Sequence, residues 1–242
     1  MAMNQLRDRS KIELKTVNVT EFLDELDGIY SELDRIAPAI DSSPCHTECT
    51  ACCSDHAPHG ALIESANIIC ALNTITEAIT VKALKEQIAH FDSLYKLCAE
   101  QLDFPIGTHE VESSDKFNVF ALKLGKMLKR CPFYLNYCVI RGHHPMVCRA
   151  YERLVCPHSG SFMPETDREL IFGRFYLKLS RLDSKLLNRI DPDLHVKETA
   201  LTLGSFLVRN LCIDEDLLFH LRIKDTKIIF TREGSRATAA FG

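Results

Sequence analysis

Eight of the eleven cysteines in this 242-residue chain lie in two short segments, and thiols gathered in this way can bind metal. The first segment, CHTECTACC, has the spacing C-x3-C-x2-C-C, and the second has the spacing C-x6-C-x9-C-x7-C. The candidate metal ligands are Cys45, Cys49, Cys52, Cys53, Cys131, Cys138, Cys148 and Cys156. Thiolates are ligands of zinc and of iron–sulfur clusters, and segments from two parts of a chain can complete one coordination shell. The sequence therefore predicts a cysteine-ligated metal site to which both segments contribute.

The adjacent pair Cys52 and Cys53 bears on the kind of centre. In an extended segment, neighbouring side chains point in opposite directions, so the two thiols favour different centres, or one ligand beside one supporting thiol. This crowding favours an iron–sulfur cluster over a closed four-cysteine zinc site. Zinc stays open as the alternative, as does the number of centres.

The other three cysteines fit the hydrophobic core. Cys70 and Cys98 lie within apolar helical patterns, and Cys212 ends one. A buried free cysteine behaves as a small hydrophobic residue, so we expect none of the three to bind metal.

The two segments together resemble the YkgJ-like cysteine-cluster family, a zinc- or iron-chelating domain with a CxxCxxCC signature. Seven cysteines match in order between about residues 45 and 151, together with Cys131-Pro132-Phe133, Cys138-Val139-Ile140, Pro145 and Cys148-Arg149. The first spacing departs from the signature, Arg141 replaces the usual tyrosine, His144 replaces the usual arginine, and Cys156 lies outside the pattern. The resemblance implies metal or cluster binding but no particular reaction.

The same signature occurs in flagellin lysine-N-methylases, so a protein lysine methyltransferase-like activity is one alternative by analogy. The chain has no G-x-G-x-x-G turn that would support cofactor binding of that kind. A structural zinc module within a helical adaptor is the other alternative, and whether the protein is an enzyme stays open.

Histidines and acids near the cysteines are further candidates for metal binding or proton transfer. They are His46, His56, His59, His143, His144 and His158, with Asp55 and Glu64 as supporting acids. A surface histidine or a solvated carboxylate is the simpler interpretation of each.

The elements that must position these residues are mainly helices. Apolar residues recur at helical spacing over 18–37, 76–101 and 167–190, with shorter helices over 61–73 and 196–212. Ile79, Leu84, Ile88, Phe91 and Tyr95 form the inward stripe of the second of these. Residues 116–130 fit either a helix or a strand followed by a turn at Gly125, and 217–231 fit a helix end followed by a strand.

These patterns predict a mainly α protein, in which a helical single domain wraps around two irregular cysteine-rich segments. Its expected parts are a flexible N-terminus (1–17), the metal-binding region (18–160), a C-terminal helical extension on the same core (161–231) and a disordered tail (232–242).

Composition and charge limit the partners and the cellular compartment that we expect for this chain. The net charge is -4 and 46% of the residues are hydrophobic, which fits a globular protein and gives no reason to expect a nucleic-acid partner. No stretch reaches about 18 apolar residues, and the N-terminus lacks a signal-peptide pattern, so we expect a cytoplasmic protein without a membrane partner. A protein partner stays open, and the basic run Lys123, Lys126, Lys129 and Arg130 is interpreted as a solvated helix face.

Overall fold

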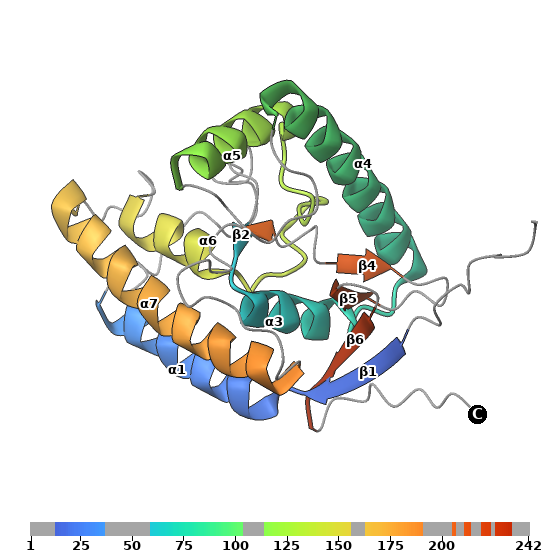
Figure 1. Ribbon diagram of the computed structural model, residues 1–242, viewed down its shortest axis with the longest axis horizontal. Helices are drawn as coiled ribbons and strands as arrows, with labels where there is room; N and C mark the ends of the chain where they lie inside the picture. The colour runs from blue at the N-terminus through green and yellow to red at the C-terminus, as the bar shows by residue number, and fades with distance from the viewer. Residues whose placement is uncertain are drawn as a thin grey trace, which may run out of the picture.

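The computed structural model describes residues 13–36, 59–103, 114–155, 163–190, 205–206, 211–213, 219–223 and 226–233. This part of the chain is mainly helical, as the sequence predicts, and it also contains a small sheet (Figure 1). The helices are α1 (Thr20–Ile36), α3 (Leu62–Leu72), α4 (Ala78–Leu102), α5 (Ser114–Leu128), α6 (Met146–Ala150) and α7 (Glu165–Ile190), with a π-helical turn η2 (Tyr151–Val155). The strands are β1 (Glu13–Asn18), β2 (His59–Gly60), β3 (Ser205–Phe206), β4 (Leu211–Ile213), β5 (Phe219–Ile223) and β6 (Thr226–Thr231).

Helix α3 is the centre of the core. Every one of its residues except Cys70 is buried, as expected for a helix whose sequence is apolar on nearly all sides. It contacts α1, α7, β5 and β6, so the helical layer and the sheet both pack on it (Figure 1). A charged or polar side chain on α3 must therefore find its partners inside the protein.

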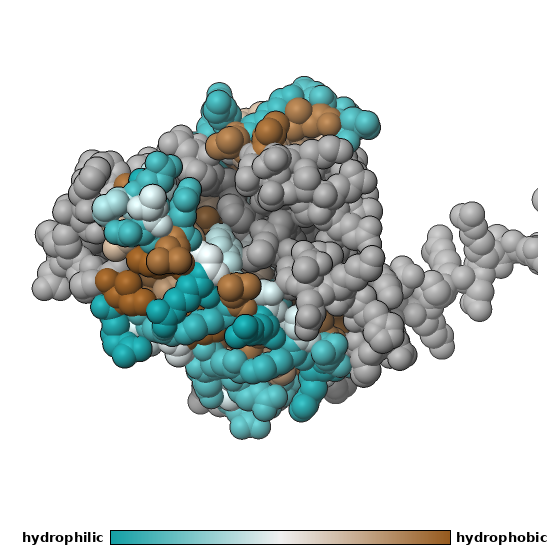
Figure 2. Space-filling model, turned by 60° about the vertical axis from the view of Figure 1, so that its left-hand side comes forward, coloured by the Kyte–Doolittle hydropathy of each residue, from teal (hydrophilic) through white to brown (hydrophobic). Residues whose placement is uncertain are grey.

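Helices α1 and α7 lie side by side and antiparallel, because Glu25 near the start of α1 pairs with Lys185 near the end of α7, while Glu32 pairs with Lys178 and Arg174. Their apolar stripes face the core through Leu23, Leu26, Leu33, Phe175, Leu179, Leu182 and Leu186. On the side turned forward in Figure 2, the described surface is largely hydrophilic, with hydrophobic patches between the polar residues.

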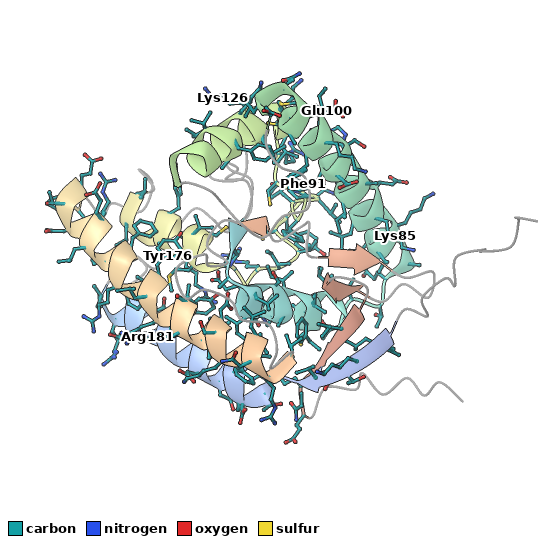
Figure 3. The ribbon with its side chains drawn as sticks, in the orientation of Figure 1. Lys85, Phe91, Glu100, Lys126, Tyr176 and Arg181 are labelled. Carbon is teal, nitrogen blue, oxygen red and sulfur yellow. The ribbon has the colours of Figure 1, made fainter. Side chains whose placement is uncertain are left out.

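Helices α4 and α5 pack against each other at the other side of the molecule (Figure 1). Four residues of the predicted inward stripe of α4, namely Leu84, Ile88, Phe91 and Tyr95, are buried, and Figure 3 shows Phe91 pointing into the interior. The prediction is wrong for Ile79, which is 85% exposed, because the buried face continues from Leu84 back to Val81, three positions away, and not to Ile79, five positions away. The ambiguous segment forms α5, and Phe120 of that helix meets Tyr95 with ring centroids 4.9 Å apart.

The sheet has the strand order β1-β6-β5-β4, and β1 pairs in parallel with β6. Strand β1 corrects the prediction of a flexible segment for residues 13–17, since Glu13–Asn18 is hydrogen-bonded in the sheet, whereas residues 1–12 lie outside the described residues. The register joins Glu13 to Thr226, two residues more than 200 positions apart in the chain. A strand whose partner is so distant leaves little local signal, which is why a reading of 1–17 alone missed it.

The C-terminal part also differs from the prediction of a helical extension. Helix α7 forms as expected, but β3 lies within 196–212, where a helix was predicted, β4 begins there, and β5 and β6 follow them. Cys212 pairs with His220 in the ladder between β4 and β5, so it is a strand residue rather than the end of a helix. Short apolar runs fit either element, and here pairing with β5 decides in favour of the strand.

Several predictions fall on other parts of the chain. The first cysteine segment, Cys156 and residues 234–242 of the predicted tail lie outside the described residues, so a helical domain wrapped around both cysteine segments stays a prediction. No helix in the described part of the chain combines the length and the apolar character needed to cross a membrane.

Candidate functional site

The second cysteine segment is a series of tight turns that ends in α6. The N–H of Tyr134 bonds to the carbonyl of Cys131 at 3.0 Å, and the N–H of Arg141 bonds to the carbonyl of Cys138 at 3.2 Å. The carbonyl of Pro145 then accepts from the N–H groups of Cys148 and Arg149 and starts α6. These backbone bonds, rather than long helices or strands, fix the positions of the three cysteines.

Apolar side chains anchor these turns in the core. Phe133, Ile140 and Met146 are each at most 2% exposed and belong to the same hydrophobic cluster as α3. Gly142 has a φ of 85°, in the left-handed region that glycine adopts at low cost. The chain can therefore turn sharply at Gly142 while its neighbours stay packed.

The three described cysteines of this segment are thiols without a disulfide. Cys131 is buried, whereas Cys138 and Cys148 are half-buried. Within the described residues, no group of three or more His, Cys, Asp or Glu side chains is placed so that it could hold a metal ion. The predicted ligands Cys45, Cys49, Cys52, Cys53 and Cys156 lie outside these residues, so the metal site stays a prediction.

A buried carboxylate lies under this segment. Glu64 of α3 is 1% exposed, and its carboxylate accepts hydrogen bonds from the Tyr30 hydroxyl at 2.7 Å, from the Ala61 N–H at 2.9 Å and from the Met146 N–H. Burial raises the pKa of Glu64, while these hydrogen bonds and the charge of Arg149 oppose the rise. Tyr30 is also buried, which together with the neighbouring Glu64 raises its pKa well above the ordinary value and keeps its hydroxyl a donor.

Arg149, next to Cys148 in the chain, clamps the turn that precedes α6. Its Nε donates to the carbonyl of His144 at 3.1 Å, and its Nη2 donates to the carbonyl of Gly142 at 2.6 Å. The guanidinium carbon lies 4.1 Å from the centre of the Tyr30 ring, in a cation–π contact. A single side chain thus joins the cysteine segment to α1.

Tyr176 of α7 borders the same region, and Figure 3 shows it between α7 and α6. Burial raises its pKa, with smaller contributions from the charges of Glu64 and Cys148. Cys148 also raises the pKa of Tyr30. A negative charge on Cys148 thus raises the pKa values of two buried tyrosines, and Arg149, the next residue, carries a permanent positive charge.

The histidines of this segment have different surroundings. His143 Nδ1 lies 3.0 Å from the amide oxygen of Asn67, within hydrogen-bond distance, and burial lowers the pKa of His143. Burial lowers the pKa of His144 to about 4, with a further decrease from the charge of Arg149, so the ring is neutral at pH 7. His59 is described only as part of β2, and His46, His56 and His158 lie outside the described residues.

Glu64 and Asp183, two buried carboxylates, can be recognised in the sequence in the same way, as single acids among apolar helical residues. Glu64 is the only charge in the apolar run ALIESANIICAL, and it is buried and bonded, which corrects the simpler interpretation of a solvated acid. Asp183, which sequence reasoning missed, lies between core leucines of α7 and accepts from the N–H groups of Leu62 and Ile63 at 2.7 Å each. A lone acid within an apolar helical face was the available clue to both.

Two of the three cysteines that sequence reasoning assigned to the core, Cys98 and Cys70, lie in surroundings consistent with that role, and the side chain of Cys212 is outside the described part of the structure. Cys98 is 0% exposed, with Sγ 3.9 Å from the carbonyl of Phe120, and burial raises its pKa. Burial raises the pKa of Cys70 to about 11, so its thiol keeps its proton at neutral pH, unlike a metal-bound thiolate.

Comparison with known proteins adds no identification: the chain matches no family model, and neither the curated proteins nor the solved structures include a significant match.

Proposed function

We propose that this chain is a cysteine-ligated metal-binding protein in which the two cysteine segments share a site. The favoured group is an iron–sulfur cluster, and zinc is the alternative. The proposed ligands are the eight cysteines of the two segments, and the proposal includes a distant relationship to the YkgJ-like family.

One contact carries the proposal. Strand β2, which follows the first cysteine segment, packs against α6, which contains Cys148 (Figure 1). Only six positions separate Cys53 from His59, so covalent geometry keeps Cys53 within about 20 Å of β2. A chain of this length can bring the first set of thiols to the second without rearranging the core.

The second cysteine segment includes a π-helical turn just before its last cysteine. Helix α6 continues into η2, and Cys156 follows Val155 directly. Single π-helical turns are rare in proteins, and many of those that occur are at functional sites. Cys156 is thus the residue that follows, in the sequence, the helical stretch that contains Cys148.

The donor set suits a soft metal. Thiolates are the preferred ligands of iron–sulfur clusters and zinc, and their summed negative charge favours a fixed cation such as the guanidinium of Arg149 nearby. When bound, an iron–sulfur cluster would supply one-electron transfer, whereas zinc would mainly supply folding energy. The chain's own contribution is to place the thiols and to bury Cys131.

The first test is the metal content of the full chain purified without oxygen. We expect stoichiometric iron and sulfide with broad visible absorbance, and Cys148→Ser should lower the metal content at least several-fold, because a hydroxyl is a poor ligand for a soft metal. Colourless protein with tightly held zinc would select the alternative metal. Protein that holds neither after reconstitution would contradict the proposal.

Cys98→Ala is the matched control. It removes a buried thiol that lies between α4 and α5, so it should lower stability without changing the metal content per folded chain. Equal metal loss in Cys148→Ser and Cys98→Ala would show that the division between ligand and core cysteines is wrong.

A further inference from the structure

We infer that Glu64 is a positioning residue of the cysteine site, whose carboxylate holds α6, the helix carrying Cys148, against α1 and the start of α3, the two elements that flank the first cysteine segment in the sequence. This inference rests on the proposed function, since it assigns the residue that orients that same site. Glu64 itself is not assigned as a metal ligand.

Two of the three hydrogen bonds to Glu64 come from other elements, and the third is a local cap at the start of its own helix. Tyr30 belongs to α1, Ala61 precedes α3, and Met146 begins α6. Because Glu64 is buried, no water replaces a lost partner without cost. The carboxylate therefore fixes α1 and α6 relative to the start of α3.

Each of these pieces leads to a cysteine segment. Helix α1 ends at Ile36, nine positions before Cys45, and Ala61 lies eight positions after Cys53. Met146 lies two positions before Cys148. One carboxylate thus contacts the chain before the first cysteine segment, the chain after it and the helix that carries Cys148. A residue that aligns the two halves of the site must make contacts of this kind.

The alternative is that Glu64 only stabilises the start of α3. Asp183 provides the comparison, because it is equally buried and bonds to the N–H groups of Leu62 and Ile63 at the same helix start. It reaches them from α7, a helix without a cysteine. Asp183→Asn should weaken the same helix start without loosening the bond between α3 and α6.

The test compares metal retention in Glu64→Gln and Asp183→Asn, using the full chain loaded with the metal that it holds when purified without oxygen. Glutamine has one acceptor oxygen in place of two, so it cannot serve all three donors. We expect Glu64→Gln to lose metal to a competing chelator about tenfold more readily, the scale seen for residues that orient ligands. The visible or paramagnetic spectrum of the bound group should also shift. Asp183→Asn should lower the unfolding temperature but change retention less than about twofold.

Tyr30→Phe is the second variant, for the case in which Glu64→Gln does not fold. It removes one donor and leaves the carboxylate with its two backbone partners, so we expect about threefold weaker retention in a folded protein. Retention that falls in parallel with stability in all variants, or that is unchanged in Glu64→Gln and Tyr30→Phe, would overturn the inference. Wild-type protein without metal would instead contradict the proposed function itself.

Discussion

At the level of single residues, buried polar groups join the cysteine segment to the helices beneath it. Glu64 and Arg149 both contact Tyr30, one through its hydroxyl and the other over its ring. Arg149 also bonds to two carbonyl groups of the turn before α6. Local backbone turns, one aromatic ring and two opposite charges therefore determine where Cys148 lies.

His144 predicts a pH dependence of stability. Its pKa is lowered by burial to about 4, against an ordinary value of 6.5, so between these values the unfolded chain binds a proton that the folded chain does not. The neutral ring makes its full contribution to the free energy of unfolding above pH 6.5, and this contribution is lost as the pH falls toward 4. We expect a loss of up to about 3 kcal/mol over this range, measured by urea unfolding.

His144→Gln should reduce the dependence of stability on pH between 6.5 and 4. The control is His90→Gln, which removes an exposed histidine of α4 and so corrects for the loss of a histidine as such. A His144→Gln variant with the same slope as the wild type would contradict the assignment.

At the level of the elements, charged residues on α1 and α7 reinforce an apolar interface. The periodicity of α1 gives an apolar stripe and an acidic face, but the sequence does not show which basic residues meet that face. In the structure, α7 supplies Lys178 and Arg174 to Glu32, and Lys185 to Glu25. The pairs agree with the antiparallel packing that the buried leucines support.

Glu32→Gln tests this interface. A hydrogen bond from Lys178, together with the charges of Lys178 and Arg174, lowers the pKa of Glu32. The ionised carboxylate therefore stabilises the fold above the ordinary pKa of a glutamate, and this stabilisation is lost as the pH falls through the lowered pKa. We expect a loss of about 0.5–1 kcal/mol at pH 7 and low salt, with a smaller loss at high salt.

Glu25→Gln is the comparison for Glu32→Gln, because its pair with Lys185 is more exposed on both sides. It should cost less, since exposed ion pairs contribute little to stability. The two variants are compared by chemical denaturation at two salt concentrations. An equal and salt-independent loss in both would argue against the interface pairs.

At the level of the whole molecule, the N-terminal and C-terminal strands close the fold around α3. Strand β6 pairs with β1, and the N–H of Val19 bonds to the carbonyl of Thr231 at 3.0 Å, at the point where α1 begins. The Nζ of Lys15 on β1 donates to the carbonyl of Ile190, the last residue of α7. The sheet therefore fixes one end of each of the two long helices that flank α3.

Phe230→Ala should destabilise the whole fold. Phe230 is 2% exposed on the face of β6 turned toward the core, so we expect a loss of about 3–5 kcal/mol in the free energy of unfolding. Ile229, its neighbour, is only half-buried, because adjacent strand residues face opposite sides. Ile229→Ala should cost about 1 kcal/mol, the usual size for a substitution outside the core. Similar losses in both variants, measured by thermal unfolding, would contradict this orientation of β6.

The sequence by itself determined the long helices, because their apolar residues recur at intervals that only one face of a helix brings together. This holds for α1, α4 and α7, and for the burial of Cys98 within α4. The eight-cysteine pattern also came from sequence alone, and it stays a prediction about metal.

Only the tertiary structure decided the sheet and the partners of the buried acids. Pairing of β1 with β6 depends on residues more than 200 positions apart, and the bonds of Glu64 to Tyr30 and Met146 join residues that are distant in the chain. Local periodicity shows that a side chain must be buried, whereas the identity of its partner depends on how the helices pack. For this reason the sequence could mark Glu64 as unusual, but only the packing of α1, α3 and α6 showed that its carboxylate bonds to Tyr30 and Met146.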